Sequence, residues 1–340
     1  MKIDVKFTKV VMYMSLLLCL TMLLTVCTDP TPPETKPPPL RVEWTYWPGF
    51  YPMAIAIELG LFAKHGVEVK PLLYDSAAKA VSDFSAKMLD GVMLPTSDIL
   101  PLATRIPLKV VLIIDISAGA DNVVARADIK SVRDLEGKRI GYSPGDFSEL
   151  FILKMLKQNG LTRQDVTLMA IDSEDVLEAL EQNLIAAGNT WEPYTSAAVR
   201  GGNRVIFSST ETPGLIMDAA TFHASVVAAR PNDILAFNTA WFEAVEFWEN
   251  NPAEAAQMIA KHTDLKPEEV SSEGLKIFSV ADNKAAFLRN QELTSVYSSA
   301  HAYIDLFVAT GQLSVIPDLE ELFDSSFIES LDTAEIGEKL

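Results

Sequence analysis

Acidic, aromatic and small polar side chains gather in the loops that follow strand-like segments of this 340-residue sequence. In open α/β folds, such loops lie beyond the carboxyl ends of the strands, where ligands bind. Aromatic rings would wall a cavity there, and hydroxyls and carboxylates would orient a small polar molecule. The candidate ligand-binding residues are Trp47, Phe50, Tyr51, Asp75, Thr96, Ser97, Asp98, Asp115, Ser143, Trp191, Glu192, Asp218 and His223.

The charged residues of these loops are acidic, and no Lys or Arg lies among them. This bias favours a neutral or amine-bearing ligand, such as an aminopyrimidine, a guanidine or an amide. The alternative is an anion held by helix N-termini, which need no basic side chain. Some of the acids stand at helix starts, where they cap N–H groups whatever the function. The acids in question are Asp75, Asp98, Asp115, Asp121, Asp146, Glu192 and Asp218.

The sequence lacks the common motifs of catalysis and metal binding. It has no G-x-G-x-x-G after a strand, no P-loop, no H-E-x-x-H and no G-x-S-x-G. The histidines are scattered without metal-ligand spacing, and only His223 is placed to face a cleft. Cys19 and Cys27 are the two cysteines, so the chain after Cys27 has no disulfide framework and no thiol nucleophile. We expect no catalytic residue, metal or cofactor.

Strand-like and helix-like segments alternate from Leu40 onward, which predicts an α/β protein with parallel sheets between helices. Residues 108–115 form a continuous apolar run, typical of a buried parallel strand. Residues 146–160 are spaced as an amphipathic helix that opens with Asp146 and Glu149, a capping-box arrangement.

The same alternation predicts a second α/β unit inserted into the first. Two extended segments, near 122–128 and 222–230, would carry the chain out of the first lobe and back, as the hinge of a two-lobed clamshell. We place lobe one at residues 40–125 and 226–340, and lobe two at residues 126–225.

The N-terminus has the pattern of an export signal. Residues 1–26 combine a basic start with an uncharged apolar run of about the minimum length that spans a bilayer. Leu24-Thr25-Val26-Cys27 resembles a bacterial lipobox, in which the cysteine is lipidated, although Val26 replaces the usual small residue. Residues 27–39 then form a proline-rich tether. The alternative is an uncleaved membrane anchor, and either places the body outside the cytoplasm at the membrane.

The chain is strongly acidic, with a formal net charge of −18. Removal of residues 1–26 takes away three Lys and one Asp, so the mature chain would carry −20. So negative a body repels nucleic acid and anionic lipid headgroups. We therefore expect no nucleic-acid partner, and membrane association only through the N-terminal anchor.

Three segments resemble the nitrate/sulfonate/taurine-type solute-binding proteins of ABC importers, a family that includes thiamine-pyrimidine precursor relatives. They are "EWTYWPGFYPMAIAIELGLFAKHGVEV" (43–69), "DISAGADNVVARADIKSVRDLEGKRIGYSPG" (115–145) and "TWEPYTSAAVRGG" (190–202). The resemblance runs in order from about Leu40 to Asp324. One departure is residues 183–187, Asn-Leu-Ile-Ala-Ala, where the family often has Gly-x-Val/Ile-Asp-Ala.

The resemblance implies a periplasmic-binding-protein type II fold and a monomeric receptor that is not an enzyme. Such a protein binds a small polar molecule between its lobes and delivers it to ABC permease and ATPase subunits. Two alternatives are a pyrimidine-synthase-like enzyme and a ligand-sensing partner of a membrane receptor. The enzyme branch carries a cysteine-rich motif, which this body lacks.

Overall fold

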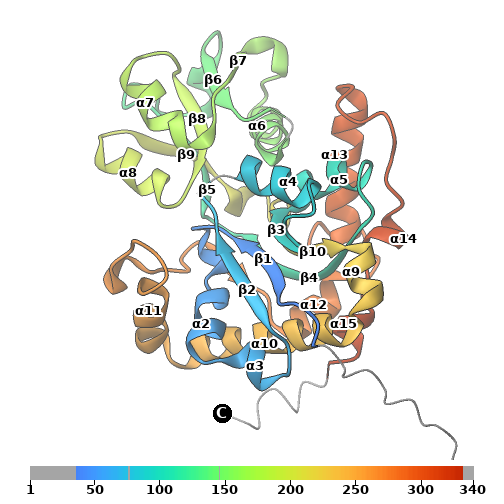
Figure 1. The fold of residues 1–340 in the computed structure, drawn as a ribbon. Coiled ribbons are helices and arrows are strands. Elements are labelled where there is room, and N and C mark those ends of the chain that lie inside the picture. Colours follow the sequence, from blue (N-terminus) through green and yellow to red (C-terminus); the bar gives the residue numbers. More distant parts are fainter. Residues whose placement is uncertain (1–35, 76, 145, 332–340) are drawn as a thin grey trace, which may run out of the picture. The chain divides into compact units, whose positions relative to one another are not determined.

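Two mixed β-sheets flanked by helices make up the described part of the computed structural model, residues 36–75, 77–144 and 146–331 (Figure 1). The predicted signal peptide, Cys27 and most of the proline-rich tether lie outside these residues. Contacts group the chain from Pro39 onward into one unit. Of the described helices, none has the length and apolar character to cross a membrane.

The first sheet has the strand order β11-β4-β10-β3-β1-β2, and the second has the order β7-β6-β8-β5-β9. The strands of the first sheet are β1 (Leu40–Trp44), β2 (Val69–Leu73), β3 (Gly91–Pro95), β4 (Leu108–Ser117), β10 (Met217–His223) and β11 (Leu275–Ile277). Those of the second are β5 (Asp121–Ala125), β6 (Arg139–Tyr142), β7 (Thr167–Ala170), β8 (Ala187–Trp191) and β9 (Arg204–Ser208).

Helices connect and cover these strands. The α-helices are α2 (Pro52–Glu58), α3 (Leu61–Lys64), α4 (Ala77–Ser85), α5 (Thr96–Ala103), α6 (Phe147–Gln158), α7 (Val176–Glu181), α8 (Tyr194–Arg200), α9 (Ala224–Ala229), α10 (Pro231–Asn250), α11 (Pro252–Ala260), α12 (Val280–Ala286), α13 (Val296–Ala309), α14 (Leu319–Leu322) and α15 (Ser326–Glu329). Short 3₁₀ turns are η1 (Pro48–Phe50), η2 (Val132–Leu135), η3 (Arg163–Asp165), η4 (Ser173–Asp175), η5 (Ser209–Glu211) and η6 (Pro267–Glu269).

The inserted second lobe is confirmed by the sheet topology. The chain leaves the first sheet at the end of β4, crosses at residues 118–120 and enters the second sheet as β5. It returns through residues 209–216 into β10. The segments predicted to cross, 122–128 and 222–230, instead contain β5 and the end of β10 with α9.

The prediction of parallel sheets is wrong for some strands. β1 pairs in parallel with β2 and β3, but β10 runs antiparallel to both β3 and β4. The double crossover explains this direction, because β4 runs toward the second lobe and β10 comes back from it. In the second sheet, β5 is antiparallel to β8 and β9 for the same reason. The extended conformation predicted through Arg230 ends at His223, where α9 begins.

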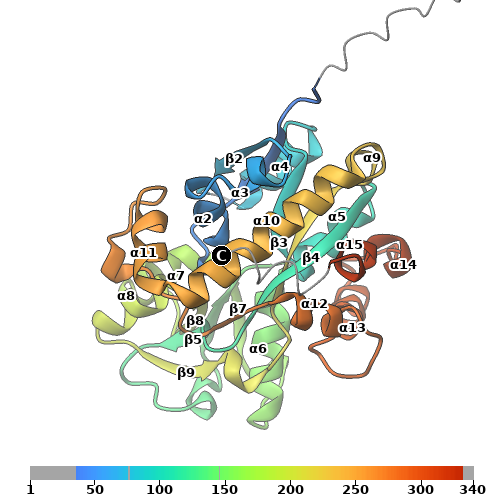
Figure 2. The same ribbon diagram turned by 90° about the horizontal axis from the view of Figure 1, so that it is seen from below.

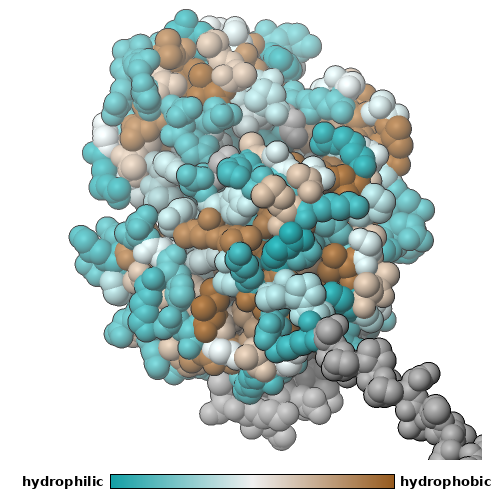
Figure 3. Space-filling model, viewed as in Figure 1, coloured by the Kyte–Doolittle hydropathy of each residue, from teal (hydrophilic) through white to brown (hydrophobic). Residues whose placement is uncertain are grey.

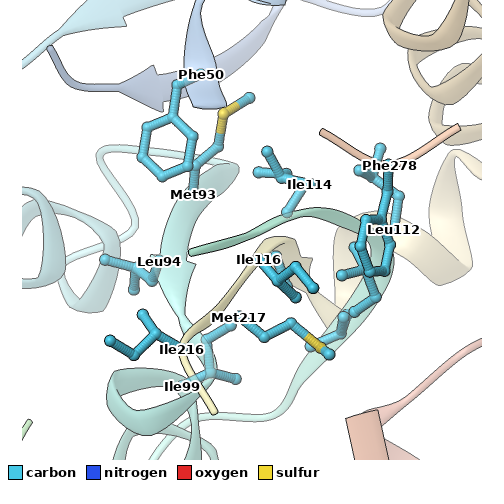
Figure 4. Packing of buried hydrophobic residues seen from close by; sticks show 14 of the residues in the cluster. Phe50, Met93, Leu94, Ile99, Leu112, Ile114, Ile116, Ile216, Met217 and Phe278 are labelled. Atoms are coloured by element: carbon cyan, nitrogen blue, oxygen red, sulfur yellow. The ribbon is translucent and has the colours of Figure 1, made fainter. Parts of the chain in front are cut away.

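β4 lies at the centre of the main hydrophobic core. Its apolar run is buried on both faces, as the sequence predicts for residues 108–115. Figure 4 shows Leu112, Ile114 and Ile116 of this strand among side chains from β3, from β10 and from Phe278, the residue after β11. The long helix α10 crosses the first sheet in Figure 2 and contacts β4 and α2. Hydrophilic residues cover most of the face drawn in Figure 3, with hydrophobic residues in smaller patches.

Asn283 on α12 fixes that helix to β4 through a buried pair of hydrogen bonds. Its Oδ1 accepts from the Ile113 N–H (2.7 Å), and its Nδ2 donates to the Ile113 carbonyl (2.8 Å). The side chain is fully buried. It therefore satisfies both backbone groups of one core residue, which would otherwise be buried without partners.

We expect Asn283→Ala to lower the free energy of unfolding by about 2–4 kcal/mol, because two buried backbone groups lose their partners. Urea unfolding monitored by circular dichroism measures this change. The matched control is Asn232→Ala on the exposed start of α10, with an expected change below about 0.5 kcal/mol. Equal effects of the two substitutions would contradict the role given to Asn283.

Candidate ligand-binding site

Two aspartates of the first sheet lie side by side where the chain passes between the lobes. Asp115 on β4 and Asp218 on β10 are direct cross-strand partners, so the two acids are held next to each other in the sheet. Their exposed fractions are 0% and 3%. Two adjacent buried carboxyls without a cation repel strongly when both are ionised, so this arrangement favours a proton on one of them.

The loop that follows β1 holds Asp115 in place. The indole Nε1 of Trp47 donates to Asp115 Oδ2 at 3.1 Å. Gly49 lies directly against this contact, and a Cβ there would overlap the Asp115 carboxylate and approach the indole nitrogen. Glycine at this position therefore lets the loop approach the carboxylate closely.

Asp121, the first residue of β5, stands just across the passage from β4. Its exposed fraction is 1%, and its Oδ2 has no hydrogen-bond partner. Burial raises the pKa of Asp121 to about 7, although the Ser117 hydroxyl partly opposes this. Burial likewise raises the pKa of Asp115 to about 7, with the Asp121 charge adding to the effect. For Asp218, burial and then the charge of Asp115 raise the pKa well above its usual value.

Asp98 and Asp146 bring one further carboxyl from each lobe. Asp98 lies in the first turn of α5, and its Oδ1 accepts from the Ser97 hydroxyl at 3.0 Å. Asp146 is the N-cap of α6, where its Oδ1 accepts from the Ser148 N–H at 2.7 Å. Burial raises the pKa of Asp98 to about 6. Burial and then the Asp98 charge raise the pKa of Asp146 well above its usual value. A carboxyl of the first lobe therefore interacts electrostatically with a carboxyl of the second.

These five residues, Asp98, Asp115, Asp121, Asp146 and Asp218, are hereafter called the aspartate cluster. In the part of the chain that the structure describes, none of them forms an ion pair with Lys, Arg or His, and no basic residue contributes to their pKa shifts. Asp115, Asp121 and Asp218 are buried and the other two are half-buried, and such a group of carboxyls without cations is a strongly electronegative environment. Its chemistry suits a ligand that carries positive charge or N–H donors.

Four further predicted site residues lie near the aspartate cluster, or at the end of β8 and in the loop that follows it. Thr96 is buried beside Ser97 with an unpaired Oγ1, and Ser143 hydrogen-bonds Asp146. Trp191 ends β8 and packs against Phe147 at a centroid distance of 6.1 Å. Glu192 follows it, and its Oε2 accepts from the Ser196 N–H at 3.2 Å.

Four predicted residues are placed elsewhere. Phe50 and Tyr51 are buried in the hydrophobic core, and the Tyr51 ring contacts Trp248. Asp75 is exposed. His223 lies at the opposite end of β10 from Asp218, where its ring stacks on Phe84 at 3.9 Å and hydrogen-bonds the Phe84 carbonyl. Burial lowers the pKa of His223, which fits a neutral packing residue.

Sequence reasoning did not select three residues that the structure brings to the site. Asp121 and Asp146 stood in the nominated loops but were absent from the candidate set. Tyr303 on α13 carried no signal, since its helix pattern is that of any packed helix. Its hydroxyl donates to the Leu215 carbonyl at 2.9 Å, and burial, followed by the charges of Asp146, Asp121, Asp98 and Asp218, raises its pKa.

Glu149 does not complete the capping box predicted for α6. Asp146 caps the helix alone, and the buried Glu149 carboxylate accepts from Gln312 Nε2 at 2.7 Å. Gln312 follows α13, which belongs to the C-terminal helices, whereas α6 covers the second sheet. This hydrogen bond therefore joins α6 to the C-terminal helices (Figure 1).

The model of the NMT1/THI5-like family matches residues 47–255, from the Trp47 loop to the start of α11. The chain belongs to this family. A putative binding protein of Brucella abortus (strain 2308) is 26% identical over 282 residues, which cover 81% of this chain and 86% of that protein.

Two solved structures extend the comparison. The periplasmic aliphatic sulphonate binding protein SsuA of Escherichia coli matches with a TM-score of 0.70 at 18% identity, over 86% of this chain and all of that one. The desulfurization enzyme DSZB matches with a TM-score of 0.64 at 14% identity, over 86% and 98% of the two chains. The periplasmic-binding-protein fold predicted from the sequence is confirmed by the first of these likenesses.

Asp121→Asn is expected to change the pH dependence of stability. The folded-state pKa of Asp121 is raised, so the folded protein holds a proton that the unfolded chain releases above about pH 4. Its contribution to stability is therefore complete below that pH and is lost as the pH rises toward about 7. At pH 8 we expect Asn to raise the free energy of unfolding by roughly 2–4 kcal/mol, and at pH 4 by little.

Urea unfolding of both proteins at pH 4 and pH 8 measures this difference. Asp305→Asn, an exposed substitution on α13, is the control and should leave the pH dependence unchanged. A wild-type protein and an Asp121→Asn variant with parallel pH profiles would show that Asp121 is not held protonated.

Proposed function

We propose that this protein is an extracytoplasmic solute-binding protein that captures a small, polar, amine-bearing molecule in the inter-lobe cleft. It would deliver this molecule to the permease of an ABC importer and catalyse no reaction. The observation that carries the proposal is the aspartate cluster, which contains acids from both lobes and no paired cation. The fold and the family support the class of protein, and the cluster supports the class of ligand.

The cluster favours a cation over an anion for a simple electrostatic reason. Buried carboxyls gain the most from a positive charge, because little water is present to screen the attraction. An anion would face five acids and would need them all protonated. Asp121 Oδ2 and Thr96 Oγ1 also lack partners, so they are free to accept from N–H groups of a ligand. The E. coli relative is named for sulphonate, but at 18% identity the likeness concerns the fold.

Closure of the lobes follows from the same groups. Asp98 belongs to the first lobe and Asp146 to the second, and each raises the cost of ionising the other. Without a ligand, ionisation of both carboxyls makes them repel and favours separation of the lobes. A cation between them removes the repulsion and stabilises the closed state, which is the state that a permease would recognise.

The remaining sequence features fit a tethered receptor. Lipidation of Cys27 and a proline-rich stalk would hold a monomeric body at the outer face of the membrane. The chain has no cysteine after Cys27, so the body lacks the cysteine-rich motif of the pyrimidine-synthase-like enzymes. A ligand-sensing partner of a membrane receptor would use the same cleft and the same ligand.

Thermal unfolding in the presence of small ligands tests the proposal. The protein from Leu40 onward is incubated with an aminopyrimidine, guanidine, urea, taurine, an alkanesulfonate or nitrate. A ligand at 100 times its Kd adds about 2.7 kcal/mol to the free energy of unfolding, which gives a clear rise in Tm. We expect a rise with the amine-bearing compounds, and loss of that rise in Asp98→Asn.

A rise with nitrate or the sulfonate alone would instead assign the site to anions. Asp305→Asn, which is remote from the cluster on the exposed side of α13, should keep the wild-type response.

A further inference from the structure

The adjacency of two buried carboxyls, Asp115 and Asp218, requires a proton on the pair when no ligand cation is bound. The two residues face each other across β4 and β10, with side chains almost fully buried, so they cannot move apart without breaking the strand pairing. In the described part of the structure, no basic side chain supplies a compensating charge. A proton is therefore the positive charge that holds this pair together.

We propose that capture of an amine-bearing ligand expels the proton shared by Asp115 and Asp218, so that the protein binds its ligand in exchange for a proton. This inference rests on the proposed function. The proton passes to solvent, the ammonium or guanidinium of the ligand stays protonated, and the net charge of the buried site is unchanged. The exchange avoids an uncompensated charge in the core, which is costly in a medium of low polarity.

Trp47 determines which carboxyl keeps the negative charge. Its indole N–H donates to Asp115 Oδ2, and a donor stabilises the ionised form of its acceptor. The shared proton consequently belongs to Asp218, which donates it to Asp115. Trp47 acts here as a positioning residue, and the contact depends on the close approach that Gly49 permits.

The other titratable groups around the pair act in the same direction. Asp121 on β5 and Asp98 on α5 face Asp218 with further negative charge, and Tyr303 on α13 lies in the same field. On the neighbouring strand β11, Lys276 pairs with Asp282 and not with the cluster. Burial and these acids raise the pKa of Asp218, so each of them favours the protonated pair.

The exchange gives ligand binding a definite pH dependence. A bound cation and the shared proton compete, so affinity rises with pH as long as the empty site holds that proton. For each proton released, the affinity changes about tenfold per pH unit. Acidification therefore releases the ligand. The pH dependence of affinity disappears in a variant whose pair cannot exchange a proton.

Infrared spectroscopy of the purified full chain at pH 7.5 tests the proton directly. Ordinary carboxyls are ionised at this pH, so the carbonyl band of protonated acids reports the buried ones. We expect Asp218→Asn to remove one carboxylic acid from this band, and Asp305→Asn to remove none. The Asn amide still donates to Asp115, which preserves the pairing. Glu43, whose pKa burial raises to about 8, contributes equally to the band of every variant and serves as an internal reference.

The second arm is calorimetry with guanidinium ion, in two buffers with different ionisation enthalpies. The wild-type protein should release about one proton more per bound guanidinium than Asp218→Asn does. Asp115→Asn is a second variant with the same expected loss, in case Asp218→Asn folds poorly. Trp47→Phe should weaken the pH dependence of affinity, whereas loss of packing alone would lower affinity equally at every pH.

The outcomes separate this inference from the proposed function. Binding of guanidinium with equal proton release in wild type and Asp218→Asn would overturn the exchange and leave the amine-binding function standing. An unchanged carbonyl band in Asp218→Asn would overturn it without any ligand. Absence of binding by every amine-bearing compound of the panel would overturn both.

Discussion

Two carboxyl groups held next to each other inside a protein are the constraint on which this site depends. Asp115 and Asp218 occupy paired positions on adjacent strands, so the backbone hydrogen bonds of the sheet enforce their proximity. Both side chains are almost fully buried in this structure. The surrounding apolar core must therefore stabilise the fold enough to tolerate five acids at one junction. The broad burial of β4, β10 and α10 supplies that stability.

The general fold could be predicted from sequence because local patterns determine it. The apolar run at 108–115 and the alternation of strands and helices required a buried sheet between helices, and the resemblance added the two-lobed form. The direction of β10 could not be predicted in this way. It depends on where the chain re-enters the first sheet after the inserted lobe, which is a long-range property.

The site was partly predictable for a related reason. Asp98, Asp115 and Asp218 could be nominated because they stand near strand ends, where α/β sheets place ligands. The same rule gave no information on which side chains of a loop turn inward. Phe50 and Tyr51 belong to the loop after β1 but pack in the core, while Trp47 of that loop reaches Asp115. Tyr303 arrives from a distant helix, and no spacing in its own segment reveals this.

The charge of the whole chain acts together with the cluster. The formal charge of −18 attracts cations over a distance of about a Debye length and raises their concentration near the surface. Under the proposed function, the buried acids would then discriminate among these cations by geometry and hydrogen bonding. Attraction at the surface is reduced by salt, whereas the buried contacts are screened far less.

Helix α6 connects the aspartate cluster to the C-terminal helices. Its N-cap residue, Asp146, belongs to the cluster. One turn later, the Glu149 carboxylate accepts a hydrogen bond from Gln312, which lies beyond the end of α13. A shift of the helix toward or away from the first lobe must stretch or reform that bond. Under the proposed function, the segment around Gln312 would therefore shift the balance between open and closed lobes, and with it the apparent affinity, without contacting the solute.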